Sequence, residues 1–202
     1  MFVARGGGAS GLVVADDFNR ADAANLGTNY TVLGSSPVIA SGRAQGGTPS
    51  LGQSIAYAAR HNTPLSSDAQ EIAFTLTAPI GGAAPGLGGG CFLRSTAGGD
   101  RVEAAITNTS ALITTRIGGT STTRASVTIS SPATARLAAV GTLYSLYING
   151  APTPTVTWTD AGGVISIGAS TRYFGLTVAA STDFASATTR GYAIDDYVAR
   201  DL

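Results

Sequence analysis

The strongest constraint on the fold of this chain is alternation of apolar and polar residues, which begins near Leu12 and continues almost to the C-terminus. In the run 71–77, Ile72, Phe74 and Leu76 share one side of an extended chain. Successive side chains of a β-strand point to opposite faces, so a period of two residues indicates strands with one buried face. No window of ten or more residues shows the 3.6-residue period of a helix. The sequence therefore predicts an all-β protein.

Turn residues divide the chain into many short strands. Asn149-Gly150 follows the apolar run 143–148, and this pair favours the positive φ angles of a type I′ turn. Short helical turns are expected only at 21–25 and 182–187. The expected strands are 29–33, 37–45, 51–59, 71–77, 90–95, 101–106, 111–118, 122–129, 134–140, 142–149, 153–159, 163–168, 172–179 and 190–200. This number of short, evenly spaced strands predicts a sandwich or a barrel.

The two ends of the chain carry the same short motif, an acidic pair followed by an aromatic residue. It reads Asp16-Asp17-Phe18 at one end and Asp195-Asp196-Tyr197 at the other. We expect these two β-type runs to lie side by side and close one sheet, with both aromatic rings in or near the core.

Residues 1–11 are rich in glycine but include the apolar Phe2 and Val3 and the basic Arg5. Such a segment is disordered unless something binds it. We therefore expect 1–11 to be a flexible N-terminal arm that anchors the protein to neighbouring subunits. Residues 12–202 are expected to form one sandwich domain.

Charge excludes several classes of partner. Charged residues make up 12% of the chain, about half the usual share, and the formal net charge is zero. This leaves no electrostatic footprint for nucleic acid or an anionic membrane, whereas a nearly neutral polar surface suits a homo-oligomer. No 18-residue apolar run and no signal-peptide core is present, so synthesis in the cytoplasm without export by that route is expected.

The residues of common active sites are scarce. Cys91 is the only cysteine and is expected to be a small buried hydrophobe, while the only histidine, His61, is expected in a solvated loop. The only glutamates, Glu71 and Glu103, fall on different expected strands, outside the Glu-x-Asp-x-x-Glu spacing of sandwich glucanases. We expect both to be surface residues on outer faces. The sequence therefore predicts a protein that is not an enzyme.

Aromatic side chains are candidates for sugar binding because sugar rings stack on exposed aromatic faces. The candidates are Trp158, Tyr147 and Tyr173, although Trp158 shares a face with Val156 and this favours a core position.

The acidic pairs raise a calcium hypothesis. If the end strands pair, Asp16, Asp17, Asp195 and Asp196 could approach one another, and Ca²⁺ prefers such oxygen clusters. Strand alternation sends neighbouring residues to opposite faces, however, so a turn or an arginine is the more usual partner of each aspartate. No other metal or cofactor is expected.

Three motifs resemble the concanavalin A-like (laminin-G-like) jelly-roll domains. They are DDFNRAD at 16–22 with LGTNYTV at 26–32, LYSLYING at 143–150, and YFGL at 173–176 with IDDYV at 194–198. They occur in the right order along nearly the whole chain. The resemblance implies a two-sheet antiparallel β-sandwich.

A lysine-free chain rich in glycine, alanine and threonine also resembles the minor tail and other virion proteins of bacteriophages that infect GC-rich actinobacteria. This resemblance implies a structural virion protein, either a minor tail or a capsid-decorating component of the phage particle. Its partners would be other virion proteins and its own copies. The alternative is a carbohydrate-binding adhesion module that recognises a host cell-surface glycan. This sequence departs from the relatives of known activity at two points: it lacks the glutamate pair of the glucanases, and it has no run of metal ligands beyond the aspartate pairs.

Overall fold

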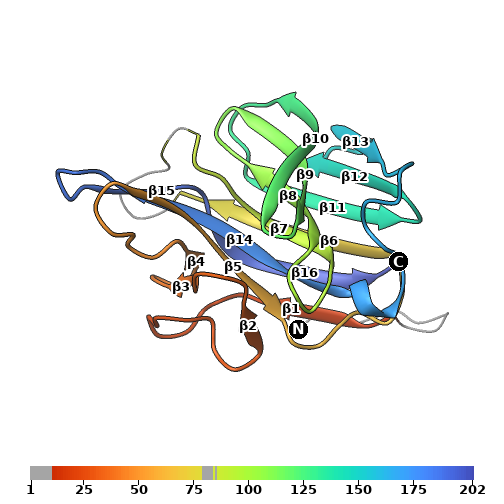
Figure 1. Ribbon diagram of the computed structural model, residues 1–202, viewed down its shortest axis with the longest axis horizontal. Helices are drawn as coiled ribbons and strands as arrows, with labels where there is room; N and C mark the ends of the chain where they lie inside the picture. Colours follow the sequence, from red (N-terminus) through yellow and green to blue (C-terminus); the bar gives the residue numbers. More distant parts are fainter. Residues whose placement is uncertain (1–10, 79–83, 85) are drawn as a thin grey trace.

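The computed structural model describes residues 11–78, 84 and 86–202, so Phe2, Val3 and Arg5 of the expected arm lie outside the described residues. Within the described part, the strands form two eight-stranded antiparallel sheets that pack face to face (Figure 1). The one helical segment in this part is a 3₁₀ turn, η1 (Ala169–Thr171). The expected all-β, two-sheet antiparallel sandwich is confirmed, and no described helix could span a membrane.

Sheet A joins the first and last strands of the chain. It contains β1 (Val13–Asp16), β3 (Val38–Ile39), β4 (Ala44–Gln45), β6 (Gln70–Thr77), β11 (Thr134–Val140), β12 (Leu143–Ile148), β13 (Val156–Thr159) and β16 (Ala193–Asp201). The strand order is β13-β12-β11-β6-β16-β4-β3, and β1 also pairs with β16.

Sheet B is built around a meander of four consecutive strands. It contains β2 (Tyr30–Val32), β5 (Gln53–His61), β7 (Gly89–Ser95), β8 (Arg101–Ile106), β9 (Ser110–Ile117), β10 (Thr120–Thr128), β14 (Tyr173–Thr182) and β15 (Thr188–Arg190). The strand order is β10-β9-β8-β7-β14-β5-β2, and β15 pairs with β14.

The core lies between the sheets and follows the alternation of the sequence. Ile72, Phe74 and Leu76 of β6 are 0%, 3% and 5% exposed, and they face Cys91 and Leu93 of sheet B within one apolar cluster. Each such side chain stabilises the fold by about 1.5–3 kcal/mol when it leaves water. The predicted burial of Cys91 is confirmed.

The ends of the chain meet as the repeated motif predicts. Strand β1 pairs antiparallel with β16, with Asp16 opposite Tyr197 (Figure 1). Phe18 and Tyr197 are 0% and 1% exposed, and their ring centroids are 5.9 Å apart. The Tyr30 hydroxyl lies 2.7 Å from both the Tyr197 hydroxyl and an Asp16 carboxylate oxygen, so hydrogen bonds join the two ends.

The expected strand at 163–168 is wrong. The Asp160 carboxylate accepts hydrogen bonds from the amides of Val164 and Ile165, at 2.9 and 2.8 Å. Amides bound by a side chain are not available to a neighbouring strand, so this segment forms a loop although it alternates in polarity.

Both expected helical turns are also wrong. Ala23 in the first segment bridges to Ile39, which ties the segment to sheet A. In the second segment β14 continues to Thr182, and the Asp183 carboxylate then accepts from the amides of Ala185 and Ala187. Contacts with other strands and a side-chain-bonded turn therefore replace the local i→i−4 bonds of a helix.

Candidate functional site

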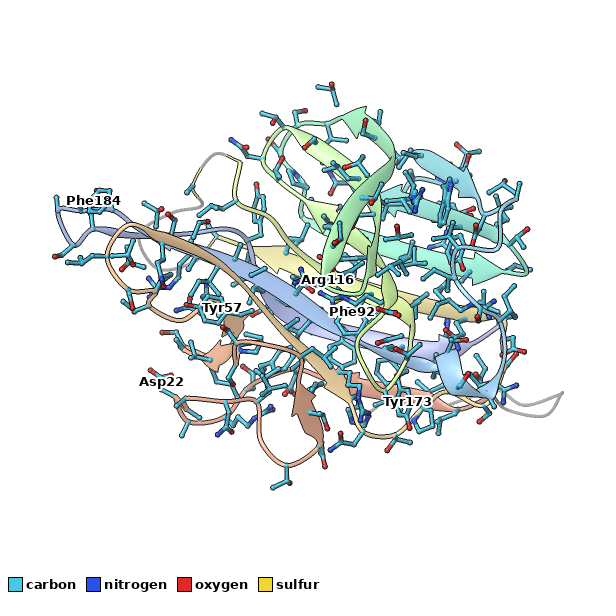
Figure 2. The ribbon with its side chains drawn as sticks, in the orientation of Figure 1. Asp22, Tyr57, Phe92, Arg116, Tyr173 and Phe184 are labelled. Atoms are coloured by element: carbon cyan, nitrogen blue, oxygen red, sulfur yellow. The ribbon has the colours of Figure 1, made fainter. Side chains whose placement is uncertain are left out.

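The outer face of sheet B carries a connected set of polar and aromatic side chains. Phe92 pairs with Gly175 on one side and Glu103 on the other, and Arg101 pairs with Arg116. Because paired residues of adjacent strands point to the same side, these side chains share the face opposite to the core. The residues of this surface, called the sheet B face, are Thr31, Arg60, Phe92, Arg101, Glu103, Thr114, Arg116, Tyr173, Gly175 and Thr177. Figure 2 labels Phe92, Arg116 and Tyr173 among the side chains.

In the middle of the sheet B face, the guanidinium of Arg101 lies over the ring of Phe92, and these two residues are called the floor of the face. The Phe92 ring crosses the neighbouring strand so closely that a Cβ atom at Gly175 would lie 2.6 Å from it. The Arg101 guanidinium carbon lies 4.7 Å from the Phe92 ring centroid, a cation–π arrangement. These contacts explain why Phe92 is 0% exposed on the outer side of a sheet.

Every group of the Arg101 guanidinium has a partner in the floor. Nε donates to Glu103 Oε2 at 3.0 Å, Nη1 to the Gly99 carbonyl at 3.1 Å, and Nη2 to Thr177 Oγ1 at 3.2 Å. A buried charge is tolerated only with such pairing. Arg101 and Glu103 thus neutralise each other and serve to hold strands β7, β8 and β14 together.

A hollow of about 460 Å³ opens beside this floor. Its walls are the β2 region at 31–34, the loop 97–100 and the turn at 118–119, and Arg116 lies in its lining. The walls are tied together, since the Asp100 carboxylate accepts from the Gly118 amide at 2.8 Å. The hollow therefore has a fixed rim of backbone and mostly small side chains, and two arginines, Arg101 and Arg116, lie in its lining.

Tyr173 stands on the same face, next to Arg60. The Arg60 guanidinium carbon lies 4.3 Å from the Tyr173 ring centroid, while Nε of Arg60 is buried and has no hydrogen-bond partner among the described residues. The Tyr173 ring is partly exposed. An aromatic face and a guanidinium with a spare donor thus lie together on the sheet B face.

The structure does not bring the three aromatic candidates from the sequence together. Tyr173 lies on the sheet B face, and Tyr147 lies on the outer face of sheet A, where Arg136 covers its ring at 3.6 Å. Trp158 faces the core side of the edge strand β13, stacked on Tyr144 at 5.1 Å and below Arg124 at 5.5 Å. One ligand cannot contact all three.

Glu71 is not the surface residue that the sequence predicts. It does lie on the outer face of sheet A, but its side chain is only 3% exposed. Arg136 donates to it at 2.6 Å, and Arg200 donates at 3.0 and 2.6 Å. The two long arginines cover the carboxylate, which explains burial at a position that faces outward.

The two glutamates are on opposite outer faces of the sandwich, Glu71 on sheet A and Glu103 on sheet B. Glycoside hydrolysis needs two carboxyl groups about 5–10 Å apart on either side of one bond. Two residues on opposite sides of the molecule cannot form such a pair.

His61 is also not the solvated residue that the sequence predicts. It ends β5 and is 9% exposed, with its ring stacked on Phe174 at 5.2 Å and edge-on to Tyr30 at 5.4 Å. The polar residues after His61 form the loop, whereas His61 itself is the last residue of strand β5.

The aspartates of the calcium hypothesis are not gathered into a site. Asp16 binds Arg20 at 2.7 Å, and Asp17 accepts from the Asn19 amide. Asp195 and Asp196 are exposed. The described residues contain no group of three or more His, Cys, Asp or Glu placed to hold a metal ion.

Sequence reasoning missed the residues that make up this site. Arg101-Val102-Glu103 alternates, with Val102 inward, and the same alternation places Arg101 and Glu103 together on the outer face. That signal was present in the sequence. The contribution of Thr177 from a strand 76 residues away was not, because it depends on which strands pair.

No family model matches this sequence, and no curated protein matches it. Solved structures do match. The carbohydrate recognition domain of Emp47p is 11% identical with a TM-score of 0.60, and the match covers 97% of this chain and 99% of that domain. The catalytic domain of an endo-1,3-β-glucanase from Thermotoga petrophila is 9% identical with a TM-score of 0.55, covering 95% and 98%. The carbohydrate-binding module CBM66 from Bacillus subtilis is 13% identical with a TM-score of 0.50, covering 86% and 92%.

At these identities the likeness concerns the fold. The neighbours are β-sandwich lectin and glycosidase domains of the concanavalin A-like kind, which confirms the jelly-roll fold expected from the sequence motifs. They include both binding domains and a catalytic domain.

Proposed function

We propose that this protein is a carbohydrate-binding module and that the sheet B face is its binding surface. The observation that carries the proposal is one face that combines a partly exposed aromatic ring, Tyr173, with a polar hollow lined by Arg116, Asp100 and Thr31. The fold neighbours whose names include carbohydrate recognition or binding add support.

The chemistry of sugars explains why this combination is suitable. A sugar ring presents an apolar C–H face, which packs on an aromatic side chain, and an edge of hydroxyl groups, which need donors and acceptors. Arg116 supplies donors and Asp100 supplies an acceptor, while Thr31, whose hydroxyl already donates to Asn62 Oδ1 at 2.6 Å, supplies a second acceptor. A few polar groups that converge in a hollow next to an aromatic surface are typical of small-molecule sites.

The outer face of sheet A is a weaker candidate although it also carries an aromatic residue. Its central guanidiniums, on Arg136 and Arg200, are both bound to Glu71. Arg136 also covers the Tyr147 ring. Groups that are already paired are not free to bind a ligand without breaking those bonds.

The module is proposed to bind without catalysis. Glu103 is the only glutamate on the sheet B face, and its carboxylate is committed to Arg101 at 3.0 Å. Glu71 and Glu103 cannot serve together as the general acid and the nucleophile of a glycosidase, because they lie on opposite faces of the sandwich.

Glycan-array binding, followed by titration calorimetry on the best ligand, tests the proposal with a matched pair of variants. Tyr173→Ala should weaken binding by about tenfold, because one stacking ring is lost. Tyr147→Ala removes the same side chain from the opposite outer face and should leave affinity unchanged. Thermal unfolding of both variants checks that the fold is intact. Loss of binding in Tyr147→Ala alone would assign the site to sheet A, and no glycan binding by the wild type would refute the proposed function.

The virion role expected from the sequence is a separate proposal and is compatible with glycan binding. It rests on the resemblance and on the arm at 1–11, whose Phe2, Val3 and Arg5 would contact other virion proteins or further copies of the chain. Deletion of residues 1–11 should abolish incorporation into phage particles. Normal incorporation of the deleted protein would eliminate the arm as an anchor.

A further inference from the structure

The sheet B face has more free positive charge than free negative charge. Arg101 and Glu103 cancel each other in the floor. Arg116 lines the hollow, and no ion pair within the described residues involves it. Arg60 likewise has no carboxylate partner there, and its contact with Tyr173 leaves a buried Nε donor unsatisfied. The Nε is enclosed by protein, so a ligand would be bound by the terminal Nη groups of Arg60, which make no hydrogen bond within the described residues.

Arg60 lies next to one wall of the hollow and Arg116 lines another, so the two free guanidiniums can contact different parts of one ligand. Arg60 is on β5 and Arg116 is on β9, with β14, β7 and β8 between them. Thr31, the partner of Arg60 on β2, lines the same hollow as Arg116, because the β2 region reaches over to the loop at 97–100. A ligand in the hollow that also reaches Arg60 therefore runs across the strands toward Tyr173, which Arg60 contacts.

We propose that the sheet B face binds an acidic glycan, whose oxyanion groups are held by Arg116 and Arg60. This inference rests on the proposed function and specifies its ligand. A planar guanidinium donates two parallel hydrogen bonds to a carboxylate or sulfate, and the pairing is stronger in a partly enclosed hollow than in bulk water.

Among the described residues that line the hollow, Asp100 is the one acid without an ion pair, and its place suits a glycan better than a simple anion. One of its carboxylate oxygens accepts from the Gly118 amide. The other oxygen is available to a sugar hydroxyl group, which donates to it. The site thus offers a guanidinium for an acidic group and a carboxylate oxygen for a hydroxyl of the same ligand.

Titration calorimetry with three oligosaccharides of equal length tests this inference. The probes are oligogalacturonate, sulfated dextran oligomers and uncharged dextran oligomers, each measured in 50 mM and 200 mM salt. At least one acidic probe should bind about tenfold more tightly than dextran, and this preference should decrease with salt. The acidic probe that binds more tightly shows whether the site prefers a carboxylate or a sulfate.

Two variants locate the effect. Arg116→Gln should weaken binding of the preferred acidic probe by about tenfold and leave dextran unchanged. Arg200→Gln makes the same change in net charge on the outer face of sheet A, where Arg136 still pairs with Glu71, and it should change neither affinity. Thermal unfolding verifies that both variants fold.

Four results would overturn the inference. Equal weakening by Arg116→Gln and Arg200→Gln would show that Arg116 does not hold the oxyanion. Equal affinity for acidic and uncharged probes removes the acidic preference but leaves glycan binding intact. Binding of a neutral glycan with no affinity for either acidic probe has the same meaning. If no glycan of any kind binds, the proposed function fails as well.

Discussion

Asp16 fixes the point at which the two ends of the chain meet. Its carboxylate accepts hydrogen bonds from the Phe18 amide at 2.9 Å, from Arg20 at 2.7 and 3.1 Å, and from the Tyr30 hydroxyl at 2.7 Å. Burial raises the pKa of Asp16, but the hydrogen bonds from Arg20, Phe18 and Tyr30 outweigh it and hold the pKa below its ordinary value of 3.8. The folded protein therefore favours the charged form.

Asp16→Asn keeps the shape of the side chain but removes its charge and one of its two acceptor atoms. The new nitrogen faces donors where an oxygen accepted two hydrogen bonds. Each hydrogen bond to a charged group contributes about 1.5–3 kcal/mol. Arg20 is 39% exposed, so water compensates for part of its loss. We expect the free energy of unfolding to decrease by about 2 kcal/mol, which lowers the melting temperature by about 4–8 °C for a chain of this size.

The dependence on pH separates this mechanism from a loss of packing. Because the folded pKa lies below the unfolded value, the contribution of Asp16 is complete above about pH 5 and is lost as pH falls through the folded pKa. The difference between wild type and variant, measured by urea unfolding, should therefore decrease in acid. Asp17→Asn is the matched control, since within the described part of the chain its exposed carboxylate accepts only from the Asn19 amide. Equal stability of Asp16→Asn at pH 7 would refute the reasoning. So would a difference that stays constant down to the lowest pH at which both proteins fold.

Three further substitutions test the packing. Gly175→Ala should destabilise by about 2 kcal/mol or more in urea unfolding, because its Cβ would overlap the Ala59 carbonyl oxygen and lie 2.6 Å from the Phe92 ring. Gly162→Ala should be neutral, because no described atom outside its chain neighbours lies within 4 Å of the new Cβ. Glu71→Gln should lower the free energy of unfolding by about 2 kcal/mol at pH 7, and the loss should be smaller in high salt if the ion pairs are responsible. Asp160→Ala should destabilise by about 2 kcal/mol and speed hydrogen exchange at 164–165, whereas a stable loop with unchanged exchange would contradict its anchoring role.

Much of the fold was predictable because strand character is a local property. The run 101–106 alternates strictly, and β8 has the same bounds as the expected strand. Asn149 and Gly150 have φ angles of 52° and 71°, as their preference for a type I′ turn predicts. The pairing of the two ends was also predictable, because the same motif stands at both ends.

The failures occur where tertiary contacts outweigh local preference. The loop at 163–168 alternates like a strand, but the Asp160 side chain binds its amides. His61 stands among polar neighbours, yet it stacks on Phe174 of another strand. Neither contact can be read from the residues around the position, because the partner comes from elsewhere in the chain.

The candidate site shows the same division. The sequence by itself determined a strand-rich chain, the inward set of apolar residues and the absence of a glutamate pair of glucanase spacing, because these depend on neighbours a few positions away. Only the tertiary structure decided that Tyr147, Tyr173 and Trp158 stand on three different surfaces. It also brought Thr177 to Arg101 and left Arg116 free in a hollow. The physical reason is that alternation states only that a side chain is inward or outward, whereas the order of strands in each sheet decides which outward side chains meet.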